Sequence, residues 1–182
     1  ICIRNGYPML DMPVNCGLTV GFRTGMKYAL RRGYDYAVQF DADGQHRPEY
    51  IKCMLDCMKK TDADIVIGSR FVTGKKEHSA RMMGARLITS LIKITTGSTI
   101  KDPTSGMRLY NHAMIERFAQ DNALNPEPES IAYLVRKGAK VREVQVSMRE
   151  RQAGESYLNI TKSIAYMVRA FTSIMFVQWF RR

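Results

Sequence analysis

Cysteine is scarce in this chain of 182 residues, and so are acidic side chains and unbroken apolar runs. The 4 cysteines form no C-x-x-C pair. Cys53 and Cys57 lie one helical turn apart in a predicted helix, so we expect both to be reduced and to face the protein interior. Together with the lack of a signal-peptide pattern, this cysteine usage favours a cytoplasmic protein over a disulfide-stabilised secreted one.

Acidic residues are outnumbered, since 17 aspartates and glutamates stand against 28 lysines and arginines and leave a formal net charge of +11. A charge of this size implies an anionic partner, such as nucleotide phosphates, a lipid phosphate, a membrane surface or a nucleic acid. The chain has no RNA-binding aromatic signature, no helix-turn-helix pattern and no zinc-finger spacing. We therefore expect phosphate-bearing ligands or a membrane surface, and no nucleic acid.

Long apolar runs are missing even from the most hydrophobic part of the chain, residues 158–180. This segment contains no acidic residue, but Lys162 and Arg169 interrupt its apolar positions. Two charges near the middle argue against a simple membrane-spanning helix. The pattern favours a basic amphipathic helix at the membrane interface, which would place the protein peripherally at the inner face of the cell membrane. Packing of the same helix on the edge of a sheet is the alternative.

The chain does contain an alternation of apolar strand-like runs and amphipathic helix patterns, which predicts an α/β fold. Its length suggests one main domain at residues 1–157, followed by the terminal helix at residues 158–182. Residues 1–5 look like the end of a strand. Helices are predicted over residues 18–32, 48–60, 80–96, 113–119 and 131–137, and strands over residues 36–40, 65–67, 107–110 and 141–146. We expect a mostly parallel sheet with helices on both faces.

The strongest chemical signal lies in residues 36–50. An apolar strand ends there in Asp41, Asp43 and Gln45, and residues two apart in an extended chain point to the same side. Oxygen ligands gathered at a strand end suit Mg²⁺ or Mn²⁺. An ion held by few protein oxygens keeps coordination positions for the phosphates of a substrate.

Other interpretations fit part of this stretch. Asp and Gly also favour a plain turn that closes a strand. A calcium loop of the EF-hand type is excluded, because its sixth and twelfth positions, which require Gly and Glu, hold His46 and Lys52. A phosphatase of the haloacid dehalogenase type would use Asp41 as its nucleophile, but Gln45 stands where that motif has threonine.

Further segments follow in an informative order. Asn15 and Gly17 begin an Asn-x-Gly pattern in the helix before the Asp41 strand. The later segments are Gly68-Ser69-Arg70-Phe71, Asp102-Pro103-Thr104-Ser105-Gly106-Met107-Arg108 and Arg151-Gln152-Ala153-Gly154-Glu155-Ser156. Taken together over residues 15–157, these segments resemble the family 2 glycosyltransferases of the GT-A fold, in particular the branch of dolichyl- and polyprenyl-phosphate mannose synthases.

This resemblance implies a truncated GT-A fold in which the first strands of the family lie outside the chain. It implies transfer of a sugar, with inversion, from a nucleotide-sugar donor to a lipid-phosphate or glycan acceptor in cell-envelope glycan synthesis. The cofactor would be Mg²⁺ or Mn²⁺, bound by Asp41, Asp43 and Gln45. A non-catalytic, membrane-associated module is the alternative from a different class.

The resemblance and the local chemistry together suggest roles for individual residues. The expected substrate-binding residues are Asn15, Gly17, Asp41, Arg70, Asp102, Ser105, Arg149 and Ser156. The expected catalytic residues are Asp43, Glu127, Glu129 and Arg151. Glu127 and Glu129 lie among prolines that restrict the backbone, although acidic residues are also common at a helix N-terminus. Met83 and Tyr157 stand where the mannose synthases carry Arg and Lys, so we expect the acceptor site or the acceptor to differ.

Overall fold

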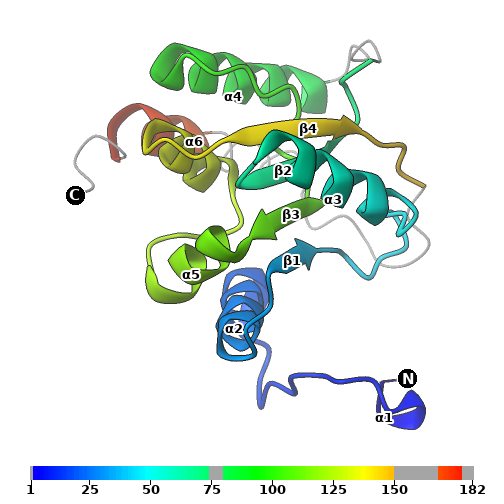
Figure 1. Ribbon diagram of the computed structural model, residues 1–182. Helices are drawn as coiled ribbons and strands as arrows, with labels where there is room; N and C mark the ends of the chain where they lie inside the picture. The colour runs from blue at the N-terminus through cyan, green and yellow to red at the C-terminus, as the bar shows by residue number, and fades with distance from the viewer. Residues whose placement is uncertain (1, 74–79, 150–167, 178–182) are drawn as a thin grey trace.

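The computed structural model describes residues 2–73, 80–149 and 168–177, and its helices and strands alternate along the chain (Figure 1). The helices are α1 (Cys2–Asn5), α2 (Gly17–Arg31), α3 (Tyr50–Thr61), α4 (Ala80–Thr96), α5 (His112–Gln120), α6 (Pro128–Arg136) and the short π-helix η1 (Ser173–Val177). The strands are β1 (Tyr36–Gln39), β2 (Ile65–Ser69), β3 (Arg108–Asn111) and β4 (Val141–Gln145). The predicted α/β alternation is confirmed.

The described strands form one sheet in the order β1-β3-β2-β4. β3 pairs antiparallel with both β1 and β2, whereas β2 and β4 pair in parallel. β1, β2 and β4 therefore run in the same direction and β3 opposes them, so the sheet is mixed, with three of its four strands in one direction. As a result, one edge of the sheet, the one formed by the strand ends, gathers the segments that follow β1, β2 and β4 and the segment that precedes β3.

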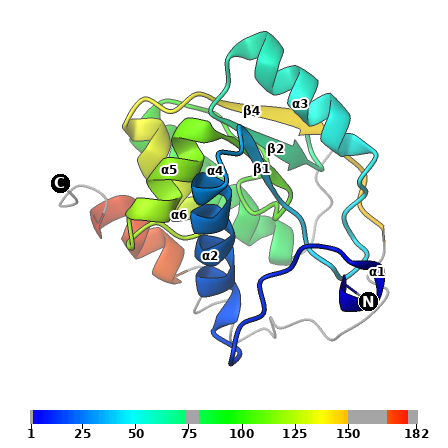
Figure 2. The ribbon, with the colours of Figure 1, turned by 60° about the horizontal axis from the view of Figure 1, so that its bottom comes forward.

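Helices cover both faces of this sheet, as predicted (Figures 1 and 2). Successive side chains of a strand point to opposite faces. On one face, Ile65 and Tyr110 join the larger core cluster, which also contains side chains from α2, α4, α5, α6 and residues 168–177. On the other face, Val66 packs in a second cluster with Met54 of α3. The sheet thus forms the middle layer of the domain.

Two local predictions are wrong. Residues 2–5 form the helix α1 rather than the end of a strand, and none of them is buried. A short apolar run has too few residues for its period to separate helix from strand. Cys53 is exposed rather than buried, because the buried stripe of α3 runs through Met54 and Met58. A residue one position before that stripe is rotated by about 100° around the helix axis.

The described part of the predicted terminal helix, residues 168–177, packs beside α4 and α6. Ala170 and Ile174 are buried in the larger core cluster. Its exposed large apolar side chains are Val168, Phe171 and Phe176. Across the described residues, no helix is both long and apolar enough to cross a membrane. The division of the chain into two parts stays a prediction.

Candidate active site at the edge of the sheet

The segment after β1 turns back instead of continuing as the extended chain that the spacing of Asp41, Asp43 and Gln45 suggested. We call residues 41–46 the acidic turn. Gly44 adopts a φ of +80°, a left-handed conformation that residues with a side chain rarely adopt. Asp43 Oδ1 accepts the backbone N–H of Gln45 over 3.0 Å, which stabilises the turn. The predicted metal ligands therefore share one short turn at the edge where β2 and β4 also end.

His46, which the sequence alone did not single out, closes the acidic turn. The residue is buried, and its Nδ1 accepts the backbone N–H of Asp41 over 2.9 Å. The other ring nitrogen, Nε2, lies 3.9 Å from Asp41 Oδ2. Burial lowers the pKa of His46, although the charges of Asp41 and Asp43 oppose this shift. A single histidine in a polar turn carries no local pattern that would reveal such a contact.

Gly106, from the segment before β3, lies against Asp41 and His46. A Cβ atom at this position would approach Asp41 Oδ2 to 2.9 Å and His46 Cε1 to 3.4 Å. Glycine at this position therefore leaves a space beside the Asp41 carboxylate, and any larger residue would fill that space. Two carboxylates and an amide oxygen on one turn also fit the donor set that Mg²⁺ and Mn²⁺ prefer.

In the part of the chain that the structure describes, the acidic turn offers too few side chains to fill the coordination sphere of a metal ion. Among those residues, no group of three or more His, Cys, Asp or Glu side chains is gathered to hold an ion. Mg²⁺ is often bound through one or two carboxylates, with substrate phosphates and water as its other ligands. The acidic turn suits an ion of this kind, which arrives with a phosphate ligand.

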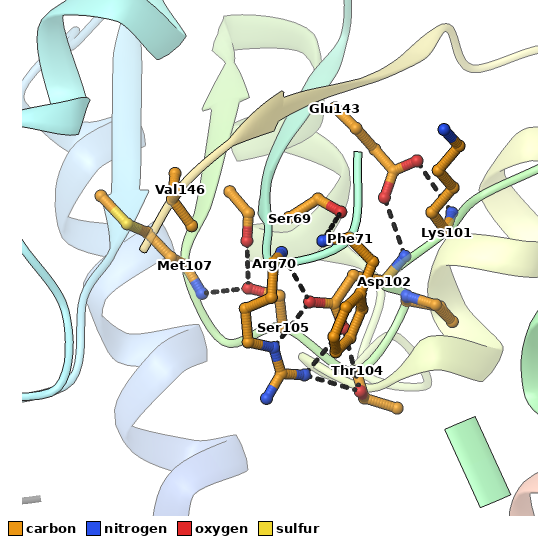
Figure 3. Close-up of polar contacts among 12 residues, drawn as sticks. Ser69, Arg70, Phe71, Lys101, Asp102, Thr104, Ser105, Met107, Glu143 and Val146 are labelled. Carbon is orange, nitrogen blue, oxygen red and sulfur yellow. Dashed lines mark hydrogen bonds and ion pairs between the residues drawn. The ribbon is translucent and has the colours of Figure 1, made fainter. Parts of the chain in front are cut away.

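Arg70, which follows β2, forms a bidentate ion pair with Asp102, which precedes β3 (Figure 3). Arg70 donates from Nε to Asp102 Oδ2 over 2.7 Å and from Nη2 to Asp102 Oδ1 over 2.8 Å. Asp102 is fully buried, and its hydrogen bond raises the pKa of the Arg70 guanidinium. Glu143 of β4 accepts the backbone N–H groups of Lys101 and Asp102, each over 2.8 Å. The substrate-binding roles of Arg70 and Asp102 stay predictions.

The loop that contains this aspartate, residues 102–106, is also held by Ser105 and Arg108. The Ser105 hydroxyl is buried and donates to the Gly68 carbonyl over 2.6 Å. Arg108, with only 2% of its surface exposed, donates from Nε to the Ser105 carbonyl and from Nη2 to the Pro103 carbonyl, both over 2.8 Å. These bonds anchor the loop next to the acidic turn. A contact between Ser105 and a substrate stays a prediction.

The segment that leaves β4 runs beside the acidic turn. The backbone N–H of Arg149 donates to the Gln45 carbonyl over 3.0 Å, and Arg149 Nη2 donates to Glu49 Oε1 over 3.3 Å. The first arginine of the predicted basic loop is therefore adjacent to a predicted metal ligand. The other two predicted residues of that loop, Arg151 and Ser156, lie outside the described residues.

Glu127 and Glu129 lie at the N-terminal end of α6, where Glu127 is the N-cap residue and Glu129 is in the first turn. Burial raises the pKa of Glu129, although the charges of Arg108 and Arg169 oppose this shift. A raised pKa is typical of a carboxyl group that transfers protons, but burial in a structural position has the same effect. The catalytic role of the two residues stays a prediction.

A groove of about 280 Å³ runs between α2 and β1 and reaches Asp41. Gly21 and Gly25 line it on the helix side, and a Cβ atom at either position would meet no atom within 4 Å. At the start of the same helix, Asn15 Oδ1 accepts the backbone N–H of Gly17 over 3.0 Å. The two residues therefore shape the first turn of α2, and their contacts with a substrate stay predictions.

An open α/β sheet with a polar site at the carboxyl ends of its strands defines a ligand-binding α/β domain. The chain belongs to a particular family of such domains, described as glycosyl transferase family 2, whose sequence profile matches residues 7–118, more than half of the chain. The predicted family is thereby confirmed. Membership also favours a glycosyltransferase over the phosphatase alternative.

Curated relatives agree with the predicted branch of this family. The chain is 31% identical over 150 residues to the undecaprenyl-phosphate mannosyltransferase of Micrococcus luteus, and this covers 79% of the chain and 61% of that protein. It is 30% identical over 150 residues to the polyprenol monophosphomannose synthase of Mycolicibacterium smegmatis, covering 79% of the chain and 56% of that protein. A third relative is the UDP-N-acetylglucosamine--dolichyl-phosphate N-acetylglucosaminyltransferase of Methanococcus voltae, 31% identical over 99 residues, which cover 51% of the chain and 38% of that protein. The chain thus spans less than two thirds of the length of each relative.

Proposed function

We propose that the protein transfers a sugar from a nucleotide-sugar donor to a polyprenyl-phosphate acceptor, in the synthesis of cell-envelope glycans. The observation that carries this proposal is the acidic turn, which this family 2 chain presents at the sheet edge where its strands end. The three relatives are named for undecaprenyl phosphate, polyprenol monophosphate and dolichyl phosphate, which supports a lipid phosphate as the acceptor. Their names differ in the sugar, so the proposal leaves the sugar open.

Asp41, Asp43 and Gln45 would hold Mg²⁺ or Mn²⁺ against the diphosphate of the donor. When bound there, the ion stabilises the negative charge that develops on the departing nucleotide. The oxygen-only donor set supports this assignment, and so does the space that Gly106 leaves around Asp41. Arg149, whose backbone is bonded to Gln45 and whose guanidinium is paired with Glu49, would add a positive charge close to the same phosphates.

The acceptor phosphate is already an anion, so one of its oxygens can attack the anomeric carbon of the sugar without a protein base. The new bond forms on the face opposite the departing diphosphate, and the configuration at that carbon inverts. A hydroxyl acceptor would instead need a group to remove its proton. Glu129, whose pKa is raised by burial, is the candidate for that role.

A lipid-linked acceptor requires that the site lie close to a membrane surface. The net charge of +11 favours an anionic leaflet. The exposed apolar side chains of residues 168–177 favour contact with the interface. The protein would therefore be peripheral at the inner face of the cell membrane, attached through the segment of residues 158–182.

A two-step experiment on the full-length protein tests this function. Thermal shifts with a panel of nucleoside diphosphates and nucleotide-sugars, with and without Mn²⁺, identify the donor. That donor, radiolabelled in the sugar, is then incubated with polyprenyl phosphate or with the matched polyprenol that lacks the phosphate. We expect transfer to the phosphate alone. Absence of any metal-dependent shift would overturn the donor assignment, and a bound donor without transfer to the phosphate would overturn the acceptor assignment.

A further inference from the structure

We propose that His46 is a positioning residue: its ring fixes the backbone of Asp41 and, with the space left at Gly106, thereby sets the direction in which the Asp41 carboxylate receives the metal–diphosphate. This inference rests on the proposed function, because it concerns the ion that the donor diphosphate would bring. The sequence alone assigns neither residue a role, although Gly106 lies in one of the segments that carry the family resemblance. Both are identified by their contacts with Asp41 in the folded chain.

His46 bonds to the backbone of Asp41, and its ring lies beside the Asp41 side chain. Its Nδ1 accepts the Asp41 N–H over 2.9 Å, which leaves the proton of a neutral ring on Nε2. Nε2 then lies 3.9 Å from Asp41 Oδ2. Only 6% of the surface of His46 is exposed, so water has little access to its hydrogen bond with Asp41. Phe40 packs edge-on against the ring, with the centroids 5.3 Å apart, and limits its movement.

Gly106 adds a second boundary, from a different part of the chain. The position of its missing Cβ is 2.9 Å from Asp41 Oδ2 and 3.6 Å from His46 Nε2, so it borders both groups. The loop of Gly106 cannot shift easily, because Ser105 is bonded to the Gly68 carbonyl over 2.6 Å. The carboxylate, whose side chain is 45% exposed, is therefore bordered on its inner side by an imidazole ring from its own turn and by the glycine of an anchored loop.

Groups that orient a metal ligand without touching the ion affect metal affinity strongly, typically by about 10- to 100-fold when they are removed. This gives His46 a role that differs from core packing. A packing role depends on the size of the ring, whereas a positioning role depends on an acceptor at the location of Nδ1. Asparagine places its Oδ1 near the location of Nδ1, whereas glutamine extends its amide toward the location of Nε2.

The experiment measures Mn²⁺ affinity by electron paramagnetic resonance, in the full-length protein with a nucleoside diphosphate present. The variants are His46→Asn, His46→Gln and Gly106→Ala, and His112→Asn is the matched control, since His112 is an exposed histidine bonded to the Tyr34 carbonyl. We expect His46→Gln and Gly106→Ala to bind Mn²⁺ roughly tenfold or more weakly. His46→Asn should stay within about threefold of wild type, because it restores the acceptor, and the control should match wild type.

Two further measurements separate the possible outcomes. Thermal unfolding shows whether each variant is folded. If a His46 variant is unstable, Gly106→Ala still tests the inference, because it perturbs Asp41 from the side of the loop. Slow hydrogen exchange of the Asp41 amide in wild type, and faster exchange in His46→Gln, is expected without any metal. Wild-type protein that binds no Mn²⁺ would overturn the proposed function, and this inference with it. Two outcomes would overturn this inference and leave the proposed function standing. One is normal Mn²⁺ binding by wild type and by the folded His46→Gln and Gly106→Ala variants. The other is an equal loss of binding in His46→Asn and His46→Gln.

Discussion

At the scale of single residues, Asp43 combines a predicted role as a metal ligand with an observed role in the acidic turn, and different substitutions can separate the two. Its carboxylate is a predicted metal ligand, and its Oδ1 also accepts the Gln45 N–H over 3.0 Å. Asp43→Asn keeps an oxygen for this hydrogen bond but removes the charge, whereas Asp43→Ala removes both. We expect both variants to lose metal-dependent donor binding and to lower turnover by roughly 100-fold or more, measured as initial rates with Mn²⁺.

The two Asp43 variants should differ in stability. Asp43→Ala should lower the free energy of unfolding by about 1 kcal/mol, the usual net contribution of one hydrogen bond, and Asp43→Asn should not. Urea unfolding curves measure this difference. Normal metal dependence and turnover in Asp43→Asn would remove this residue from the proposed metal site.

Glu129 leads to a pH-dependent prediction, because burial raises its pKa. The folded protein then holds this proton more tightly than the unfolded chain does. Stability should therefore decrease as the pH rises from the unfolded pKa, about 4.3, through the higher folded pKa. Relative to wild type, Glu129→Gln should gain unfolding free energy across this window and show a constant difference above it. A difference that does not change between pH 4 and 8 in urea unfolding would contradict the raised pKa.

The same substitution distinguishes two kinds of acceptor. Transfer to a lipid phosphate needs no protein base, so Glu129→Gln should keep turnover within a few-fold of wild type with polyprenyl phosphate. Loss of a general base typically costs about 10²- to 10⁴-fold. A loss of that size, with a melting temperature no lower than that of wild type, would instead identify Glu129 as a base and indicate a hydroxyl acceptor.

At the scale of elements, most helices and strands could be predicted because each presents an apolar stripe or run to a core. α4 was predicted over the residues that it occupies, Ala80–Thr96. The location of the acidic turn also followed from local sequence, since an apolar run ends just before Asp41. Its shape did not, because the turn depends on the left-handed backbone of Gly44 and on the ring of His46.

Contacts between distant segments could not be predicted from local patterns. Arg70 and Asp102 are 32 positions apart and meet because β3 lies beside β2. Gly106 meets Asp41 because β3 also lies beside β1. Arg108 is an exception to the rule that charged side chains stay outside, and its bonds to the Ser105 and Pro103 carbonyl groups stabilise it there. These contacts depend on the order of the strands in the sheet, and the apolar pattern of a single strand does not predict that order.

The loop between α4 and β3 offers a prediction about stability. Removing one partner of a buried ion pair costs about 3–5 kcal/mol. Arg70 is partly exposed, so Asp102→Asn should cost less, about 2–3 kcal/mol in urea unfolding. The matched control is Asp62→Asn, which changes an exposed pair with Lys140 and should cost far less, because exposed ion pairs contribute little to stability. Equal costs for the two substitutions would show that the Arg70–Asp102 pair does not stabilise the loop.

At the scale of the whole molecule, the proposed contact with an anionic membrane rests on the net charge of +11 and on the exposed apolar side chains of residues 168–177. Deleting the C-terminal segment would be a poor test of this, because Ala170 and Ile174 belong to the larger core cluster and their loss would disturb the domain. Substitution of exposed side chains avoids this problem. The triple-serine variant replaces Val168, Phe171 and Phe176.

We expect the full-length protein to co-sediment with anionic vesicles, and less so at high salt. Each basic residue near such a surface contributes about 1 kcal/mol, and salt screens this attraction. The triple-serine variant should remain largely in the supernatant with an unchanged melting temperature, because it loses the apolar contact with the interface. The matched control replaces three exposed apolar residues at the other terminus with serine and should bind like wild type; these residues are Ile3, Leu10 and Val14. Equal sedimentation of the two variants would reject this surface as the membrane contact and leave packing against α4 and α6 as the role of the segment.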